Sequence, residues 1–181
     1  MNYIILDLEA TCWNPESVQY PQEIIEIGAC WINSYMEVKK TFSRLVRPVF
    51  QPNLSMYCKQ LTGISQEDVD KSKSFDMVFH QFIDWCDEPE NGISIYTWGA
   101  KDYQLLSADC KAHKIEMDWM HGYVDLKSQF ARIKALPKPI GLDKALMAEG
   151  YDFEGARHRA LPDAINLSKL FIKYFEEWQK V

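Results

Sequence analysis

The sequence predicts a mixed α/β domain, on three observations. Three strand-like segments come before any long helical pattern, and helical and strand-like segments alternate after them. Of the 181 residues, 47% are apolar and 25% are charged, a mixture typical of globular proteins. A chain of this length is expected to form a single domain, residues 1–181, and its composition excludes disordered, collagen-like and coiled-coil chains.

The first part of the predicted sheet is an antiparallel meander. Residues 3–8 form a short apolar run that ends in acids, which is typical of a buried strand. Residues 23–33 are rich in isoleucine, and residues 38–46 show an alternation that includes Phe42 and Val46. Three successive strands without an intervening helix most simply pair as a meander.

The second part of the chain adds helices and two further strands. Short helices are expected at residues 54–60 and 66–69. Residues 74–86 place apolar side chains at helical spacing, which predicts an amphipathic helix. Strands are expected at residues 93–98 and 123–126, and further helices at residues 102–113, 127–133, 142–149 and 159–178. The result is a five-stranded mixed sheet flanked by helices.

The composition and the hydrophobic pattern indicate the cellular compartment and the class of partner. The first apolar run stops at Asp7, and no run approaches the roughly 20 residues that cross a bilayer, so neither a signal peptide nor a membrane segment is expected. The five cysteines include no C-x-x-C pair, which argues against a zinc ribbon and favours a reduced, cytoplasmic protein. The net charge of −6 by itself argues against a polyanionic partner.

Acidic side chains end or begin several of these elements. Asp7 and Glu9 close the first strand on one face, because side chains two residues apart on a strand point the same way. Asp102 and Asp163 stand near the starts of two helices. Each has an ordinary explanation: a polar strand end for the first pair, an N-cap for Asp102 and a dipole contact for Asp163. His158 is equally explained as a solvated loop histidine.

Taken together, the four acids predict a site for divalent cations. Mg²⁺ and Mn²⁺ prefer carboxylate oxygens, and the lack of an accompanying thiolate or second histidine disfavours zinc. Four ionised acids carry a charge of about −4, which two divalent cations would balance, so that a phosphate could approach. Glu23 and Glu26 point to opposite faces of their strand and are interpreted as structural.

Three segments share the order and spacing of a known set of motifs: Asp7-Leu8-Glu9-Ala10-Thr11-Cys12, Trp98-Gly99-Ala100-Lys101-Asp102 and His158-Arg159-Ala160-Leu161-Pro162-Asp163-Ala164. They resemble the exonuclease motifs of the DEDDh superfamily, which includes RNase T and the proofreading epsilon subunit of replicative polymerase. Residues 7–12, 23–27, 46–48, 54–58 and 61–64 further resemble the enhanced-RNAi and histone-mRNA exonuclease branch, near which KapD-like bacterial proteins belong.

The resemblance implies an RNase H-like fold and a two-metal hydrolysis of the terminal phosphodiester. Asp7, Glu9 and Asp163 would then hold the metal that activates water, with Asp7 bridging to a second metal supported by Asp102. His158 would act as general base, because histidine side chains exchange protons near neutral pH.

The resemblance also implies a pocket for the 3′-terminal nucleotide. The backbone of residues Ala10, Thr11 and Cys12 would face that nucleotide, and Leu61 and Thr62 would flank its base. The alternative for the second segment is a helix end packed into the core. Trp98 is a candidate for stacking on a base, although packing within the protein explains it equally well.

The expected function is that of a 3′-to-5′ exonuclease with two Mg²⁺ or Mn²⁺ ions. It would release nucleoside 5′-monophosphates from single-stranded RNA or DNA 3′ ends, with RNA favoured by the narrower resemblance. Three alternatives remain: a DNA-directed exonuclease, a nuclease-like regulatory module that binds a protein partner, and an aspartyl phosphatase. The phosphatase requires Asp at the position of Glu9. The sequence makes no prediction of oligomeric state.

Overall fold

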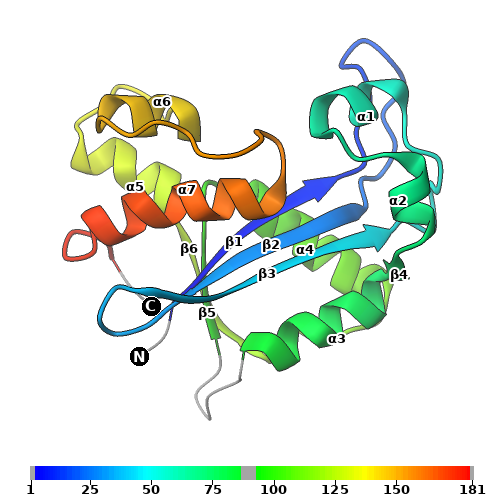
Figure 1. Ribbon diagram of the computed structural model, residues 1–181, viewed down its shortest axis with the longest axis horizontal. Coiled ribbons are helices and arrows are strands. Elements are labelled where there is room, and N and C mark those ends of the chain that lie inside the picture. The colour runs from blue at the N-terminus through cyan, green and yellow to red at the C-terminus, as the bar shows by residue number, and fades with distance from the viewer. Residues whose placement is uncertain (1–2, 87–92, 180–181) are drawn as a thin grey trace.

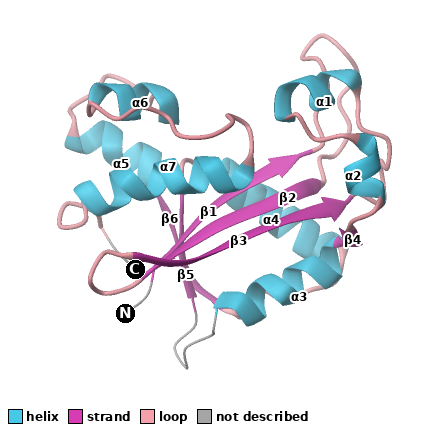
Figure 2. Cartoon of the chain, viewed as in Figure 1, coloured by secondary structure: helices cyan, strands magenta, loops and turns pink. Residues whose placement is uncertain are grey.

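The computed structural model describes residues 3–86 and 93–179, which build one sheet with helices on both faces (Figure 1, Figure 2). The strands lie in the order β4-β3-β2-β1-β5-β6. Their bounds are β1 (Tyr3–Ala10), β2 (Ile24–Ile32), β3 (Val38–Arg47), β4 (Lys73–Ser74), β5 (Ile93–Thr97) and β6 (Met120–Asp125). β1, β2 and β3 pair antiparallel, as the predicted meander requires, and β5 runs parallel to both β1 and β6.

The helices form two layers, one on each face of the sheet. Their bounds are α1 (Met56–Thr62), α2 (Gln66–Asp70), α3 (Phe75–Cys86), α4 (Lys101–Ala112), α5 (Leu126–Ile133), α6 (Leu142–Ala148) and α7 (Ala160–Lys173). On β1, Ile4 and Leu6 pack into the cluster that contains α3 and α4, whereas Tyr3 and Ile5 pack against α7. This alternation follows from the period of two along a strand.

The structure differs from the sequence prediction most at two elements, whereas the bounds of several others shift by one to three residues. The sheet has a sixth strand, β4, which runs parallel to the end of β3 and pairs only with Val46 and Arg47. Two residues are too few to display an alternating pattern, so the prediction of five strands was wrong. The last helix ends at Lys173 rather than near residue 178. Trp178 is nevertheless buried in the apolar cluster around α7, and its indole N–H donates to the Phe171 carbonyl at 2.9 Å.

Two expectations based on composition can be compared with the described residues. None of the helices there has the length and apolarity that crossing a bilayer requires. All five cysteines carry free thiols, with Cys12 partly accessible and the others buried.

The N-terminus of α7 packs directly on β2, and a glycine permits the contact. Gly28 lies opposite Asp7 in the β1–β2 register. A Cβ atom at position 28 would lie 2.1 Å from the carbonyl carbon of Ala160 and 2.2 Å from the nitrogen of Leu161. Backbone cannot yield as a flexible side chain does, so residue 28 must lack a side chain for α7 to begin where it does.

Gly28→Ala is expected to destabilise the protein by at least about 2 kcal/mol, because overpacking a rigid contact strains the core. Thermal or chemical unfolding measures the effect. Gly141→Ala is the matched control, since Gly141 has an ordinary φ of −67° and no atom within 4 Å of an added Cβ. Equal stabilities for the two variants would contradict a tight α7–β2 contact.

Candidate active site

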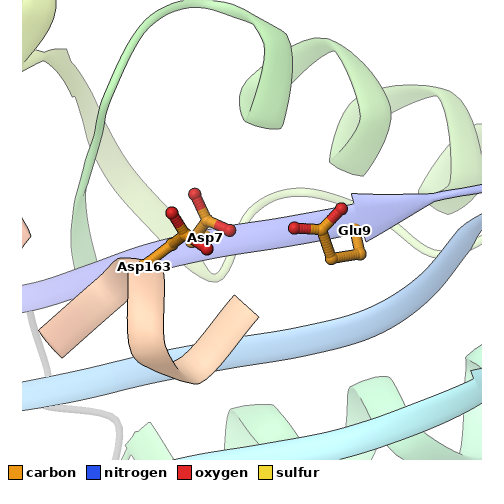
Figure 3. Close-up of side chains that lie close together, drawn as sticks. All are labelled: Asp7, Glu9 and Asp163. Carbon is orange, nitrogen blue, oxygen red and sulfur yellow. The ribbon is translucent and has the colours of Figure 1, made fainter. Parts of the chain in front are cut away.

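Two acids of the site lie side by side on β1. The strand continues to Ala10, so both Asp7 and Glu9 belong to it and face the layer of α7. Carboxylate oxygens of Asp7, Glu9 and Asp163 all lie within 4.8 Å of one another (Figure 3). Residues from the first strand and the last helix, far apart in sequence, therefore form one acidic cluster.

Asp163 is placed by the first turn of α7. Its Oδ2 accepts a hydrogen bond from the backbone N–H of Arg159 at 3.1 Å. The carboxylate thus binds a free donor at the helix N-terminus, where a negative charge is also favoured by the helix dipole. These contacts hold the side chain on the edge of α7 that faces Asp7 (Figure 3).

Asp102 reaches the site from the first turn of α4. It is 7% exposed, and its Oδ1 accepts a hydrogen bond from the backbone N–H of Leu8 at 3.1 Å. β1 pairs with β5 only at Ile4 and Ile5, so β5 offers no carbonyl to the backbone N–H of Leu8. The Asp102 carboxylate accepts the hydrogen bond from this N–H instead. Asp102 is not one of the three acids within 4.8 Å, but it contacts the backbone between two of them.

Burial raises the pKa values of all four acids, and the charge of at least one nearby carboxylate adds to each shift. Burial raises the pKa of Glu9 to about 8, and the neighbouring charges of Asp163, Glu26 and Asp102 act in the same direction. Burial likewise raises the pKa of Asp102 to about 7 and that of Asp163 to about 6. For Asp7, burial and then the charges of Asp102 and Asp163 raise the pKa well above its usual range. A cation would relieve this repulsion, so the oxygen donors fit a hard divalent ion.

A fifth acid, Glu26, lies opposite Glu9 across the β1–β2 ladder. It is 1% exposed and binds Arg159 through two bonds, Nε to Oε2 at 2.9 Å and Nη2 to Oε1 at 2.8 Å. The backbone N–H of Ala160 donates to the same carboxylate at 3.0 Å. Glu26 therefore fixes the start of α7, which is consistent with its structural interpretation. Sequence reasoning missed Arg159, since nothing in the local pattern reveals a partner 133 residues away.

Glu23 also has a structural role. Its carboxylate accepts hydrogen bonds from the backbone N–H groups of Val49, Phe50 and Gln51, at 2.6 to 3.1 Å. The loop that follows β3 is therefore tied to the start of β2. The carboxylates of Glu23 and Glu26 both accept hydrogen bonds within the fold.

His158 lies two residues before the start of α7, on an exposed turn. Its φ of +57° is unusual for a residue with a side chain. The same turn supplies the Arg159 N–H that holds Asp163, so the imidazole and the acidic cluster are positioned by one segment. His158 and Asp163 both line a groove of about 590 Å³.

The predicted substrate residues differ in how much they expose. Thr11 is 2% exposed, and its hydroxyl accepts from the Glu23 N–H at 2.9 Å. Thr62 is 3% exposed and donates to the Cys58 carbonyl at 2.9 Å. Both hydroxyls are thus used within the fold. Ala10 is also buried, whereas Cys12, Leu61 and Trp98 are partly accessible.

Trp98 has a contact that the sequence did not reveal. Its indole N–H donates to the Ile140 carbonyl at 3.1 Å, and its ring packs against Phe130 at 5.5 Å between centroids. The side chain therefore secures the segment that leads into α6. Stacking of a base on its remaining surface stays a prediction.

A family model for exonucleases, RNase T, matches residues 4–171, which include all four acids and His158. The chain belongs to the RNase T exonuclease family. The predicted family is thus confirmed. Membership in this exonuclease family, together with the acidic cluster, indicates divalent metal ions as cofactors.

Two curated relatives illustrate the reach of the similarity. The 3′-5′ exoribonuclease 1 of Mus musculus is 28% identical over 96% of this chain and 52% of that protein. The probable 3′-5′ exonuclease KapD of Bacillus subtilis (strain 168) is 34% identical over 93% of this chain and 82% of that protein. This chain spans about half the length of the mammalian relatives that it matches.

A solved structure supports the same assignment. The nuclease domain of 3′hExo, a DEDDh family member bound to rAMP, has a TM-score of 0.88 and 26% identity to this chain. The match covers 99% of this chain and 97% of that domain. The RNase H-like α/β fold expected from the motifs is confirmed, apart from the additional strand β4.

Without metal, the stability of the protein is expected to fall as pH rises. The pKa of Glu9 shifts from an ordinary 4.5 to about 8, so the folded state binds more protons than the unfolded chain between these values. This contribution to stability is fully present below the ordinary pKa of 4.5. It is lost as the pH rises through the folded-state pKa of about 8. Thermal unfolding in EDTA measures this trend, and added Mn²⁺ or Mg²⁺ should stabilise the protein more at pH 8 than at pH 5.5.

Glu9→Gln supplies the control for this measurement. The variant keeps the size of the side chain and removes one titrating group, so its stability in EDTA should depend less on pH. A wild-type melting temperature that does not change with pH in EDTA would contradict the mutual repulsion of the acids.

Proposed function

We propose that this protein is a metal-dependent 3′-to-5′ exonuclease that releases nucleoside 5′-monophosphates from single-stranded nucleic acid, with RNA favoured over DNA. The observation that carries the proposal is the approach of Asp7, Glu9 and Asp163 to within 4.8 Å at the N-terminus of α7. Family membership supports the reaction class. The free thiols fit a reducing, cytoplasmic setting.

Asp7, Glu9 and Asp163 would hold one divalent cation, and Asp102 would support a second one that Asp7 shares. Mg²⁺ and Mn²⁺ both suit this set, because all the donors are carboxylate oxygens. When bound, the two cations would supply positive charge to the attacking and leaving oxygens of the phosphodiester. The hydrogen bonds from Leu8 to Asp102 and from Arg159 to Asp163 orient two of these carboxylates before any metal binds.

His158 is assigned the general base. It accepts a proton from the attacking water as the water oxygen bonds to phosphorus, and the bond from phosphorus to the 3′ oxygen of the preceding nucleotide breaks. Its exposed position on the turn before α7 leaves the imidazole free to approach a bound substrate.

The preference for RNA follows the mammalian relatives, which are named as exoribonucleases, and the nuclease domain of 3′hExo solved with rAMP. The terminal nucleotide would lie against the backbone of Ala10 and Cys12, with Leu61 beside its base. Discrimination against DNA requires contacts to the 2′-hydroxyl of the substrate.

One assay tests the reaction class and the sugar preference. The same sequence is supplied as a 5′-labelled oligoribonucleotide and as an oligodeoxyribonucleotide, each with Mg²⁺ or Mn²⁺. We expect stepwise shortening from the 3′ end, faster on RNA, that stops in EDTA and in the Asp7→Asn variant. Faster shortening of the DNA would reverse the proposed preference. If the protein hydrolyses neither oligonucleotide but binds a protein partner tightly, a regulatory module is favoured instead.

His158→Ala is expected to slow hydrolysis by about 100-fold or more, because general-base catalysis typically contributes this much. The stabilisation by Mn²⁺ should persist, since the carboxylates remain. His121→Ala is the matched control, because His121 is exposed near the start of β6 and is expected to retain the wild-type rate. An unchanged rate in His158→Ala would remove this residue from the mechanism.

A further inference from the structure

A groove of about 590 Å³ leads away from the acidic cluster along the segment that precedes α6 and its first turn. Its lining includes Lys138, Ile140, Lys144 and Arg157, together with His158 and Asp163 of the candidate active site. The groove is therefore continuous with the place where the scissile phosphate is expected. It is also large enough for part of a nucleotide chain.

The charges in this groove are unevenly paired. Arg157 binds Asp143 at 2.7 Å, and Asp163 belongs to the acidic cluster. Lys138 and Lys144 have no ion-pair partner within the described residues. Two uncompensated cations thus lie beside the site in a chain whose net charge is −6.

The nearby basic residues are engaged elsewhere. Lys134 binds Glu149 at 2.9 Å, and Arg132 donates to the Gln179 side chain at 3.4 Å. Of the basic residues at 132, 134, 138 and 144, only the last two line the groove, so the positive charge without an ion-pair partner there comes from Lys138 and Lys144.

The wall that carries Lys138 is held in place. Pro137 and Pro139 flank this lysine and restrict the backbone on both sides. The Trp98 indole N–H binds the Ile140 carbonyl at 3.1 Å, which fastens the wall to the end of β5. A cation on a fixed segment loses less conformational freedom when it binds an anion than a cation on a mobile loop does.

The direction of the groove is opposite to that of the candidate base pocket. Beyond Glu9, the chain leads toward α1, where the Ser55 hydroxyl donates to the Cys12 carbonyl at 2.6 Å. The groove instead lies toward α6, and Figure 1 shows α1 and α6 on opposite sides of the α7 N-terminus. A strand whose 3′ nucleotide lies near α1 and whose scissile phosphate lies at the acids must continue past the groove.

We propose that Lys138 and Lys144 bind backbone phosphates of the single strand on the 5′ side of the scissile bond. The proposal rests on the proposed function and extends it by assigning the path of the substrate. Lysine ammonium groups bind phosphates without reading the base, so this contact adds affinity and is independent of sequence.

The test compares an octaribonucleotide with a dinucleotide, which has no phosphodiester upstream of the scissile one. In the Lys138→Gln/Lys144→Gln double variant, we expect the ratio of kcat/KM for the octamer to kcat/KM for the dinucleotide to fall about tenfold. The loss should lie mainly in KM. The dependence of octamer binding on salt should also weaken, by a slope of about 1.4 for two lost contacts to a single strand.

Lys39→Gln/Lys111→Gln is the matched control. Both lysines are exposed and lie outside the groove, and the two substitutions remove the same amount of charge. This variant should keep the wild-type ratio. An equal fall in both double variants would indicate a general charge effect, and no fall in the groove variant would also overturn the proposal.

A second measurement separates this proposal from the proposed function. Fluorescence anisotropy of the labelled octamer with Ca²⁺ reports binding without requiring hydrolysis. Weaker binding by the groove variant than by the control variant supports phosphate binding in the groove. If the wild type also cleaves nothing, the proposed exonuclease activity is refuted while the groove proposal stands. Equal binding by both variants, or no binding by the wild type, overturns the groove.

Discussion

The docking of the α7 N-terminus on β2 is the constraint on which the site depends. It brings Asp163, from the last helix, next to Asp7, from the first strand. Gly28 allows the two backbones to touch, and Glu26 binds both the side chain of Arg159 and the backbone of Ala160. A buried ion pair adds little net stability, because desolvation offsets much of the Coulomb attraction. Its contribution here is to define where the helix begins.

The same burial that assembles the acids makes their charges unfavourable. Glu9 faces Glu26 across the ladder, and Asp7 lies near Asp102 and Asp163. A domain selected for stability alone would replace some of these carboxylates with neutral groups. Their retention in one small region is typical of functional sites, where unfavourable electrostatics in the free protein favour binding of an oppositely charged ligand.

The sequence was sufficient to predict the elements and the acids but not the contacts that align them. Asp7 and Glu9 follow from the period of two along a strand, and the amphipathic 74–86 segment became α3 with one residue trimmed. The partner of Glu26 and the carbonyl bound by Trp98 depend on tertiary placement, which local patterns do not encode. β4 forms only because its two residues pass beside β3.

The short length of β4 has a consequence for the sheet as a whole. Since β4 pairs only with Val46 and Arg47, most of the outer rim of β3 has no neighbouring strand among the described residues. Lys39, Lys40 and Arg44 lie along that rim. Positive charges on an unprotected rim oppose strand-to-strand joining of separate molecules, so the sheet resists growth into aggregates although its rim is open.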